Sequence, residues 1–458
     1  MFDDIVCEYR DAPLGDARRS ARLERIGQRL ALDPTRSFPD AMGSEGQLEA
    51  LYRFLNNDGV SFQRILQAHA RRSAKRCIER GEHLVLHDTT AMEFPGERDG
   101  LGRLETSARN GFFLHVSLAV TTAREPLGVL AAETWARTAP PKGKANKRDT
   151  RKDPERESLR WTRGVVAAEE ILDAGGTAVH VMDREGDNYD LFATLQADGI
   201  RHVVRLAHNR NLVGTEEKLK EVARRAPCVF QREVPVGRKP KGWAIDQKRP
   251  ATHREARMAT LAVSAVSVEL RRSSNHVPGV PPGLTVNIVT VQENDCPPGV
   301  VPVTWFLVTT ESITTRQDLE FIVDAYRARW VVEEFFKALK SGCQFERRQL
   351  ESFRSLDNAL ALFLPIAVRL LALRGAARAA PTADCTILTS QQLAILRRHT
   401  TRFMSPRPTN EEAAMALAEF GGHLRSNGPP GWAILGRAFE RLLLIEIGWN
   451  QRADAIDD

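Results

Sequence analysis

Three acidic residues, far apart in the sequence, have the type and spacing that metal-assisted chemistry on a phosphodiester would use. Asp88 and Asp183 each end a short apolar run typical of a β-strand, and Glu333 lies in a segment with helical periodicity. Cleavage by two divalent ions needs oxygen ligands that leave room for water and the scissile phosphate. Mg²⁺ prefers one or two carboxylates together with substrate oxygens and waters. We therefore expect Asp88, Asp183 and Glu333 to converge as ligands of such ions.

The segment around Glu333 carries basic and aromatic side chains at matching positions. At about 100° per residue on an α-helix, Tyr326, Arg329, Glu333 and Lys340 fall within roughly 60° of one another. The apolar residues between them fall mainly on another face, which is typical of a helix packed on a core. The segment thus predicts a helix that buries one side and offers the other to a metal ion or a polyanion.

Each acid also has an ordinary interpretation when it is taken alone. Asp88 could cap a turn, Asp183 opens an Asp-Arg-Glu-Gly-Asp stretch with turn chemistry, and Glu333 could lie on a solvated helix face. Only their combination favours catalysis. Zinc is not expected, because His87 and His180 lack the partners of a closed zinc site, and His87 is expected to pack behind the ligands.

The elements around the acids predict an α/β fold in three parts. The range 1–75 has helical periodicity, and 76–375 alternates strands with helices, which indicates a sheet of mixed direction. Both aspartates would lie at the carboxyl ends of strands, where open α/β sheets place their sites. Within the middle part, about 207–302 has the short strands, Pro and Gly of a β-rich insertion. Residues 376–458 are again helical in pattern.

Basic residues recur outside this core. Asp16 is placed to cap a helix on which Arg18, Arg19 and Arg22 follow at helical spacing. Such a face is either solvated or in contact with DNA phosphates. The basic loop 142–152 leaves the same two interpretations open, and further basic runs lie at 237–242 and 248–249 within the expected insertion.

Bulk properties are compatible with a nucleic-acid partner without establishing one. The net charge is +6 and the pI is near 9.1. The six cysteines are scattered, which predicts reduced thiols in the cytoplasm, and no signal peptide is expected at the N-terminus. The most apolar stretch, 359–368, is interrupted by Arg369 and falls short of the ~20 residues of a membrane span. We expect a buried helix there and no membrane partner.

These motifs together resemble the DDE transposases of bacterial cut-and-paste insertion sequences. The resemblance rests on three internal segments and on the N-terminal region, and the Tyr-x2-Arg-x3-Glu-x6-Lys spacing is typical of one subgroup. The matching segments are His87-Asp-Thr-Thr90, Asp183-Arg-Glu-Gly-Asp187, Tyr326 to Lys340, Leu14-Gly-Asp16 with the arginines that follow, Gly43-Ser-Glu-Gly46 and Tyr52-Arg-Phe-Leu55. The resemblance implies an RNase H-like catalytic core at 76–375 with the β insertion. It also implies a helical DNA-end-binding domain at 1–75 and a helical dimerisation domain at 376–458.

The resemblance also implies roles for individual residues. Asp88, Asp183 and Glu333 would hold two Mg²⁺ or Mn²⁺ ions. Tyr326, Arg329 and Lys340 would contact DNA phosphates near the cut. Trp305 would stack on a base flipped from the transposon end, although a Trp at a strand start is more often part of a core. The residues implied to contact DNA are Tyr326, Arg329, Lys340, Trp305, Arg205, Arg18, Arg19 and Arg22.

The implied reaction is nicking at a transposon end, hairpin formation, hairpin opening and strand transfer. The implied partners are double-stranded DNA, as terminal inverted repeats and as target, and a second copy of the chain. Localisation would be cytoplasmic, on the nucleoid. Two alternatives remain open at this point: a nuclease that does not join strands, and an inactive or domesticated DNA-binding relative.

Overall fold

The computed structural model describes most of the chain between residues 5 and 449. The residues outside the description are 1–4, 33, 105–108, 138–155, 174–176, 238–254, 274–278, 299, 380, 386–387, 401–403, 425–429, 433, 440, 443–444, 447–448 and 450–458. The basic loop 142–152 and nearly all of 237–249 therefore lie outside the described residues.

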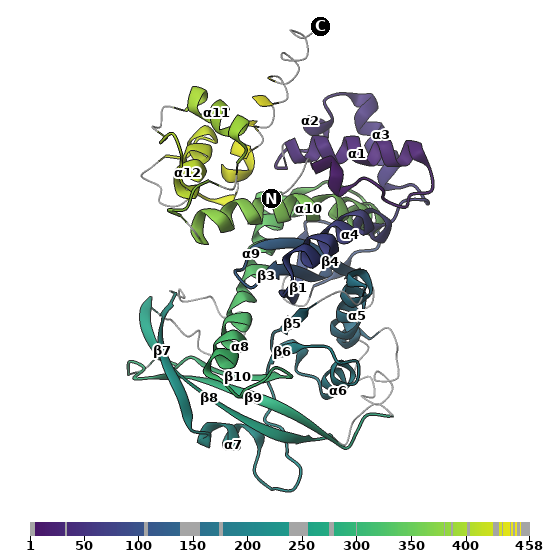
Figure 1. Cartoon of the computed structure of the whole chain (residues 1–458). Helices are drawn as coiled ribbons and strands as arrows, with labels where there is room; N and C mark the ends of the chain where they lie inside the picture. Colours follow the sequence, from purple (N-terminus) through teal and green to yellow (C-terminus); the bar gives the residue numbers. More distant parts are fainter. Residues whose placement is uncertain are drawn as a thin grey trace.

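Ten strands of the described chain form one mixed sheet (Figure 1). Their order is β2-β3-β1-β5-β6-β10-β9-β8-β7, with β4 paired to β3. The strands are β1 His83–Phe94, β2 Gly102–Arg103, β3 Asn110–Thr121, β4 Pro126–Trp135, β5 Ala178–Met182, β6 His202–Arg205, β7 Cys228–Val236, β8 Arg257–Arg271, β9 Gly283–Asn294 and β10 Thr304–Thr309. The expected α/β class with helical N- and C-terminal regions is confirmed, and the arrangement is consistent with an RNase H-like core.

The central strands are buried on both faces because helices cover both sides of the sheet. β1 and β5 pair in parallel, as do β5 and β6, and both begin as continuous buried runs. Helix α5 (Arg160–Leu172) packs on one face, where its Gly164 approaches His87. Helix α8 (Arg316–Ala328) packs on the opposite face, where Tyr326 meets Trp305. It is followed by α9 (Trp330–Lys337).

The β-rich segment expected at 207–302 extends this same sheet. Strand β9 pairs antiparallel with β10, β8 with β9, and β7 with β8, so these strands continue the core outward to an edge. The short helix α6 (Tyr189–Ala197) precedes this region, and the short helix α7 (Leu219–Arg225) lies within it. In Figure 1 the strands lie at the end of the molecule far from both terminal helical regions.

Two local expectations were wrong. The strand expected to end at Asp88 runs on to Phe94, because residues 89–94 pair antiparallel with β3. The single helix expected over 326–340 is divided into α8, α9 and a π-helical turn, η4 (Ala338–Gly342). Short π turns are common at functional sites.

The N-terminal region is helical, as expected. Its elements are η1 Ile5–Glu8, α1 Ala17–Leu32, α2 Phe38–Met42, α3 Glu45–Leu55 and α4 Phe62–Arg80. Asp16 caps α1, because its Oδ1 accepts the Arg18 N–H at 2.7 Å. Helix α4 spans the division expected at residue 75 and lies along β4, so that division stays a prediction.

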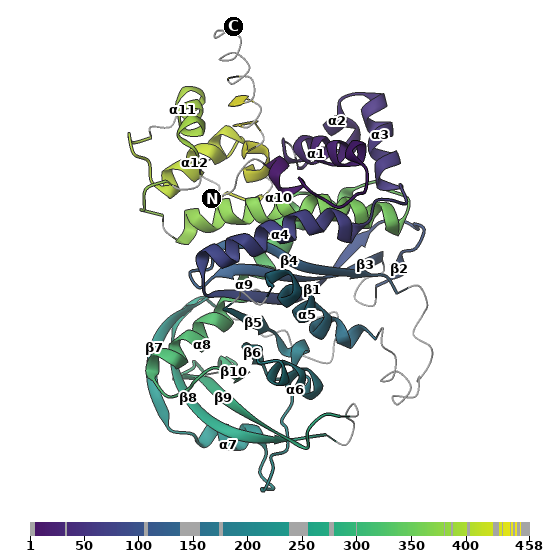
Figure 2. The same ribbon diagram turned by 45° about the vertical axis from the view of Figure 1, so that its right-hand side comes forward.

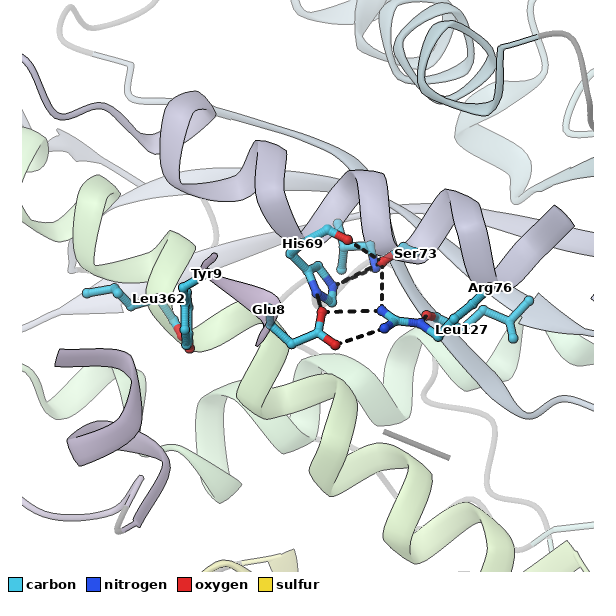
Figure 3. Close-up of polar contacts among 8 residues, drawn as sticks. Glu8, Tyr9, His69, Ser73, Arg76, Leu127 and Leu362 are labelled. Atoms are coloured by element: carbon cyan, nitrogen blue, oxygen red, sulfur yellow. Dashed lines mark hydrogen bonds and ion pairs between the residues drawn. The ribbon is translucent and has the colours of Figure 1, made fainter. Parts of the chain in front are cut away.

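A buried polar cluster joins η1 to the core (Figure 3). The Glu8 carboxylate accepts a hydrogen bond from Arg76 Nη1 at 2.8 Å and lies 2.5 Å from His69 Nδ1. Both of these partners lie on α4. His69 Nε2 accepts the Val129 N–H of β4 at 3.1 Å, so we place the proton of a neutral imidazole on Nδ1. Next to Glu8, the Tyr9 hydroxyl donates to Leu362 O at 2.6 Å. We name Glu8, His69 and Arg76 the η1 clamp.

Helix α10 (Phe353–Ala379) runs between the sheet and both terminal helical regions (Figures 1 and 2). The span Phe353–Gly375 is long and apolar enough to cross a membrane, so the stretch 359–368 belongs to a longer apolar helix than expected. In its most apolar window 89% is buried inside the protein, which fits the expected core helix. Beyond it lie α11 (Ser390–His399) and α12 (Asn410–Phe420).

Candidate active site

Strand register places the two aspartates on one face of the sheet. Leu86 is the Cα partner of Val181, and successive side chains alternate, so Asp88 and Asp183 both point to the α8 face. Pairing between β1 and β5 stops at Leu86 and Val181, so both aspartates lie just beyond the end of the parallel ladder. Asp183 then caps the 3-10 turn η3 (Arg184–Gly186), accepting the Glu185 N–H at 2.7 Å.

Arg329 links the first and third acids. Its Nη1 donates to Asp88 Oδ2 at 2.8 Å, and both of its terminal nitrogens lie 3.5 Å from Glu333 Oε1. The Arg329 and Asp88 side chains are only 13% and 14% exposed, whereas Glu333 is 38% exposed at the rim. A guanidinium with both carboxylates in contact therefore holds α9 against β1.

Asp88 is the electrostatic centre of the group. Burial raises its pKa, Arg329 and the Thr89 N–H oppose this, and the charges of Asp183 and Glu333 add to it, leaving a pKa of about 7. Burial lowers the pKa of Arg329, but nearby negative charges, those of Asp88, Asp183 and Glu333 among them, outweigh burial and raise it. Arg329 thus contacts Asp88 and Glu333, and Asp183 lies on the same face of the sheet, whereas the expected role of the three acids stays a prediction.

Three carboxylates are the ligand chemistry of a hard divalent cation. Within the described part of the chain, no three His, Cys, Asp or Glu side chains meet closely enough to hold one ion. The Arg329 guanidinium lies where a cation shared by Asp88 and Glu333 would have to bind. The donor set therefore fits a divalent ion in its chemistry, and Arg329 occupies the space between two of the three carboxylates.

The two other side chains of the expected stripe make different contacts. Tyr326 is buried, and its ring meets Trp305 edge-on at 5.2 Å. Lys340 lies on the π turn, donates to Ala91 O, and is 3.4 Å from Glu346. Within the described part of the chain, neither side chain forms a hydrogen bond or ion pair with the three acids. Ideal helical spacing therefore predicted the place of Arg329 better than that of its neighbours.

Trp305 and Arg205 share the face that carries the acids. Arg205 is the Cα partner of Leu307, so its side chain points the same way as those of Leu307 and Trp305. Trp305 is half-buried against α8, and Arg205 Nη2 lies 3.3 Å from Thr304 O. Their DNA contacts stay predictions.

The arginines of α1 are divided between exposed and internal positions. Arg18 is exposed, whereas Arg19 donates to Leu14 O at 2.9 Å and Arg22 to Gln47 at 3.1 Å. Arg19 thus holds the segment before α1, and Arg22 joins α1 to α3; the contact of all three arginines with DNA stays a prediction.

Two side chains near the site carry roles that sequence patterns did not reveal. Asp187 is buried and accepts the N–H groups of Ala207 and His208, each at 2.7 Å, which fixes the loop after β6. Arg160 donates to Thr89 Oγ1 at 3.0 Å and pairs with Glu185, joining α5 to the segments that carry both aspartates. The only sequence signal for Asp187 is that a second aspartate follows Asp183 within the same short segment, 183–187.

Two family models match parts of this chain. A model of the transposase DNA-binding domain matches residues 6–60, and a model of the transposase DDE domain matches residues 162–366. The chain belongs to the DDE transposases. A DDE transposase acts on DNA and is a transposition enzyme, so DNA is its partner. The DDE match includes Asp183 and Glu333 and begins after Asp88, so the inclusion of Asp88 rests on strand register and on Arg329.

Proposed function

We propose that this DDE transposase cuts transposon ends and joins them to target DNA at the site formed by Asp88, Asp183 and Glu333. The observation that carries the proposal is the bridge from Arg329 to Asp88 and Glu333, on the face shared with Asp183. The contacts of Arg329 with Asp88 and Glu333, together with the place of Asp183 and Glu333 inside the region that matches the transposase DDE domain, support a role of the three acids as metal ligands.

In the proposed sequence, water attacks one strand at the transposon end and frees a 3′-hydroxyl. That hydroxyl attacks the opposite strand to form a hairpin, water reopens the hairpin, and the 3′-hydroxyl finally attacks target DNA. Each step breaks one P–O bond and forms another in line, so one site can serve all of them. When bound, two Mg²⁺ or Mn²⁺ ions would activate the attacking hydroxyl and stabilise the departing oxygen.

The chain's own cations would position the DNA. Arg329 and Lys340 would exchange contacts within the protein for phosphate oxygens, which orients the phosphate and balances its charge. Trp305 would offer its ring to an unstacked base. Tyr326 is buried behind it and would reach a phosphate only through its hydroxyl.

Substitution of Glu333 tests the proposal against a matched neighbour. Glu333→Gln should abolish cleavage of end DNA while leaving DNA binding near the wild-type level, because the amide keeps the size and loses the charge. Glu334→Gln is the control, since Glu334 pairs with Lys337 and Arg374, whereas Glu333 lies beside Arg329. Normal cleavage by purified Glu333→Gln, measured on the gene's own flanking DNA with Mg²⁺, would overturn the assignment.

The remaining alternatives separate in the same assay. A nuclease without joining activity would cut the ends but fail to transfer pre-cleaved ends with a free 3′-hydroxyl into a target plasmid. An inactive DNA-binding relative would bind and do neither. We further propose that residues 376–458 pair two copies of the chain, which light scattering of the complex with end DNA would detect as two chains per two ends.

A further inference from the structure

A buried row of polar side chains crosses the sheet directly behind the acids. Ser117 Oγ of β3 lies 3.1 Å from His87 Nδ1 of β1, and His87 Nε2 lies 2.8 Å from His180 Nδ1 of β5. The row ends at α5, where His180 Nε2 lies 2.7 Å from Glu169 Oε1. Ser117 and both histidines are buried, and Glu169 is partly exposed. We name these four residues the histidine relay.

The chemistry of the relay fixes the direction of its hydrogen bonds. The Glu169 carboxylate only accepts, so we assign the proton of His180 to Nε2. His180 Nδ1 then accepts from His87 Nε2–H, which leaves His87 Nδ1 as an acceptor. Ser117 Oγ lies 3.1 Å from this nitrogen and 3.0 Å from Gly164 O of α5, and its single proton can be donated to only one of these two acceptors. Both imidazoles are neutral in this assignment. The His87–His180 and His180–Glu169 hydrogen bonds are compatible with this assignment, and such a buried polar row favours a single arrangement of the strands that it joins.

The position of the relay connects it to the active site. Backbone pairing of β1 with β5 covers only His83–Leu86 against Ala178–Val181. The His87–His180 hydrogen bond crosses between the two strands where that ladder ends, and Asp88 follows His87 on the opposite face. The backbone position of Asp88 therefore depends on how His87 is held. Catalytic groups must be held within about 0.5 Å of their working geometry.

We propose that the histidine relay is a positioning device that sets the separation of Asp88 and Asp183. The proposal rests on the proposed function of these acids as ligands of a divalent ion. Removing the middle of the relay lets the two strand ends move apart and weakens ion binding, while the surrounding core stays folded.

Mn²⁺ binding to the full chain without DNA tests this, with free Mn²⁺ counted by electron paramagnetic resonance. His87→Leu should weaken binding by about tenfold to a hundredfold, as is typical for groups that orient metal ligands. His87→Gln keeps a donor near the Nε2 position and should bind Mn²⁺ close to the wild-type level. The matched control is His83→Leu, because His83 is buried on the same face of β1 but bonds only to Gly81 O.

The outcomes separate a positioning role from general packing. If His83→Leu and His87→Leu change Mn²⁺ affinity equally, or if His87→Leu changes nothing, the relay has no special role. Should His87→Leu fail to fold by circular dichroism, Glu169→Leu at the partly exposed end of the relay must show the weakened binding instead. Asp88→Asn distinguishes the two proposals. If Asp88→Asn binds Mn²⁺ as the wild type does, the proposed metal site is wrong. If Asp88→Asn binds Mn²⁺ more weakly while His87→Leu binds it normally, only the proposal for the histidine relay is overturned.

Discussion

Neutralising Glu8 should release the N-terminal DNA-binding domain from the catalytic core in a pH-dependent way. Burial by itself raises the pKa of Glu8, but the contacts with His69 and Arg76 overcome this and leave the pKa at about 2, against an ordinary value of 4.5. Burial lowers the pKa of His69, and its Nε2 accepts the Val129 N–H, so the ring is neutral. His69 therefore stabilises ionised Glu8 by a hydrogen bond, and Arg76 provides the opposite charge. The η1 clamp therefore favours the folded chain with Glu8 ionised.

The size of the effect follows from proton linkage. A pKa lowered from 4.5 to about 2 corresponds to about 3 kcal/mol at neutral pH, which is an upper bound because His69 is neutral. A lowered carboxylate pKa stabilises the folded state above the unfolded pKa, and this contribution is lost as the pH falls. The window of loss therefore runs from about pH 4.5 down to about pH 2.

Hydrogen–deuterium exchange of peptides covering η1 and α1 measures this locally, which suits a long chain that can open in parts. At pH 7, Glu8→Gln should exchange faster by up to about a hundredfold, the equivalent of about 3 kcal/mol. After correction for intrinsic rates, the wild type should approach the variant as the pH falls through the window.

A matched surface carboxylate provides the control. Glu49 pairs with Arg53 on α3, with side chains 59% and 75% exposed, and Glu49→Gln should change exchange little because exposed pairs contribute little. A difference between wild type and Glu8→Gln that stays constant from pH 7 to pH 3 would refute the linkage argument. No difference at any pH would show that the η1 clamp does not hold the domain.

Three further predictions concern DNA and metal. Affinity for end DNA should fall steeply as the salt concentration rises. Arg18→Ala should reduce the slope of log affinity against log salt by about one, as expected for the loss of one phosphate contact. An affinity that does not change with salt would exclude contacts between the basic helix face and DNA phosphates. Trp305→Ala should impair hairpin formation more than first-strand nicking on an end-DNA substrate, and equal loss of both would exclude base stacking. Arg329→Gln removes the guanidinium in contact with Asp88 and Glu333, so Mn²⁺ should bind more tightly without DNA while cleavage falls; weaker Mn²⁺ binding would contradict the competition.

Local patterns predicted the parts of this site that depend on one element at a time. The apolar runs ending at Asp88 and Asp183 identified two strands, and alternation placed both acids on one face once β1 and β5 were paired. The cap at Asp16 was likewise visible in the sequence. These features depend on backbone period and on neighbours within a few residues.

Features that depend on long-range register escaped the same analysis. The continuation of β1 past Asp88 requires pairing with β3, and the junction of β9 with β10 makes the insertion part of the core sheet. The η1 clamp joins residues more than sixty positions apart, and the contact between Arg329 and Asp88 spans 241 positions. No periodicity within a segment encodes such partners. The π turn at Lys340 escaped for a related reason, because an ideal 100° step assumes an unbroken helix.

The internal pairing of the active-site cations implies that metal and DNA binding are coupled. Arg329 already contacts Asp88 and Glu333, and Lys340 already contacts Ala91 O and Glu346. A phosphate can recruit Arg329 only by drawing it from carboxylates that would then be left close together and uncompensated. A divalent ion that takes those carboxylates removes this cost and frees the guanidinium for the phosphate. Each ligand should therefore bind more tightly in the presence of the other, and by linkage the two factors must be equal.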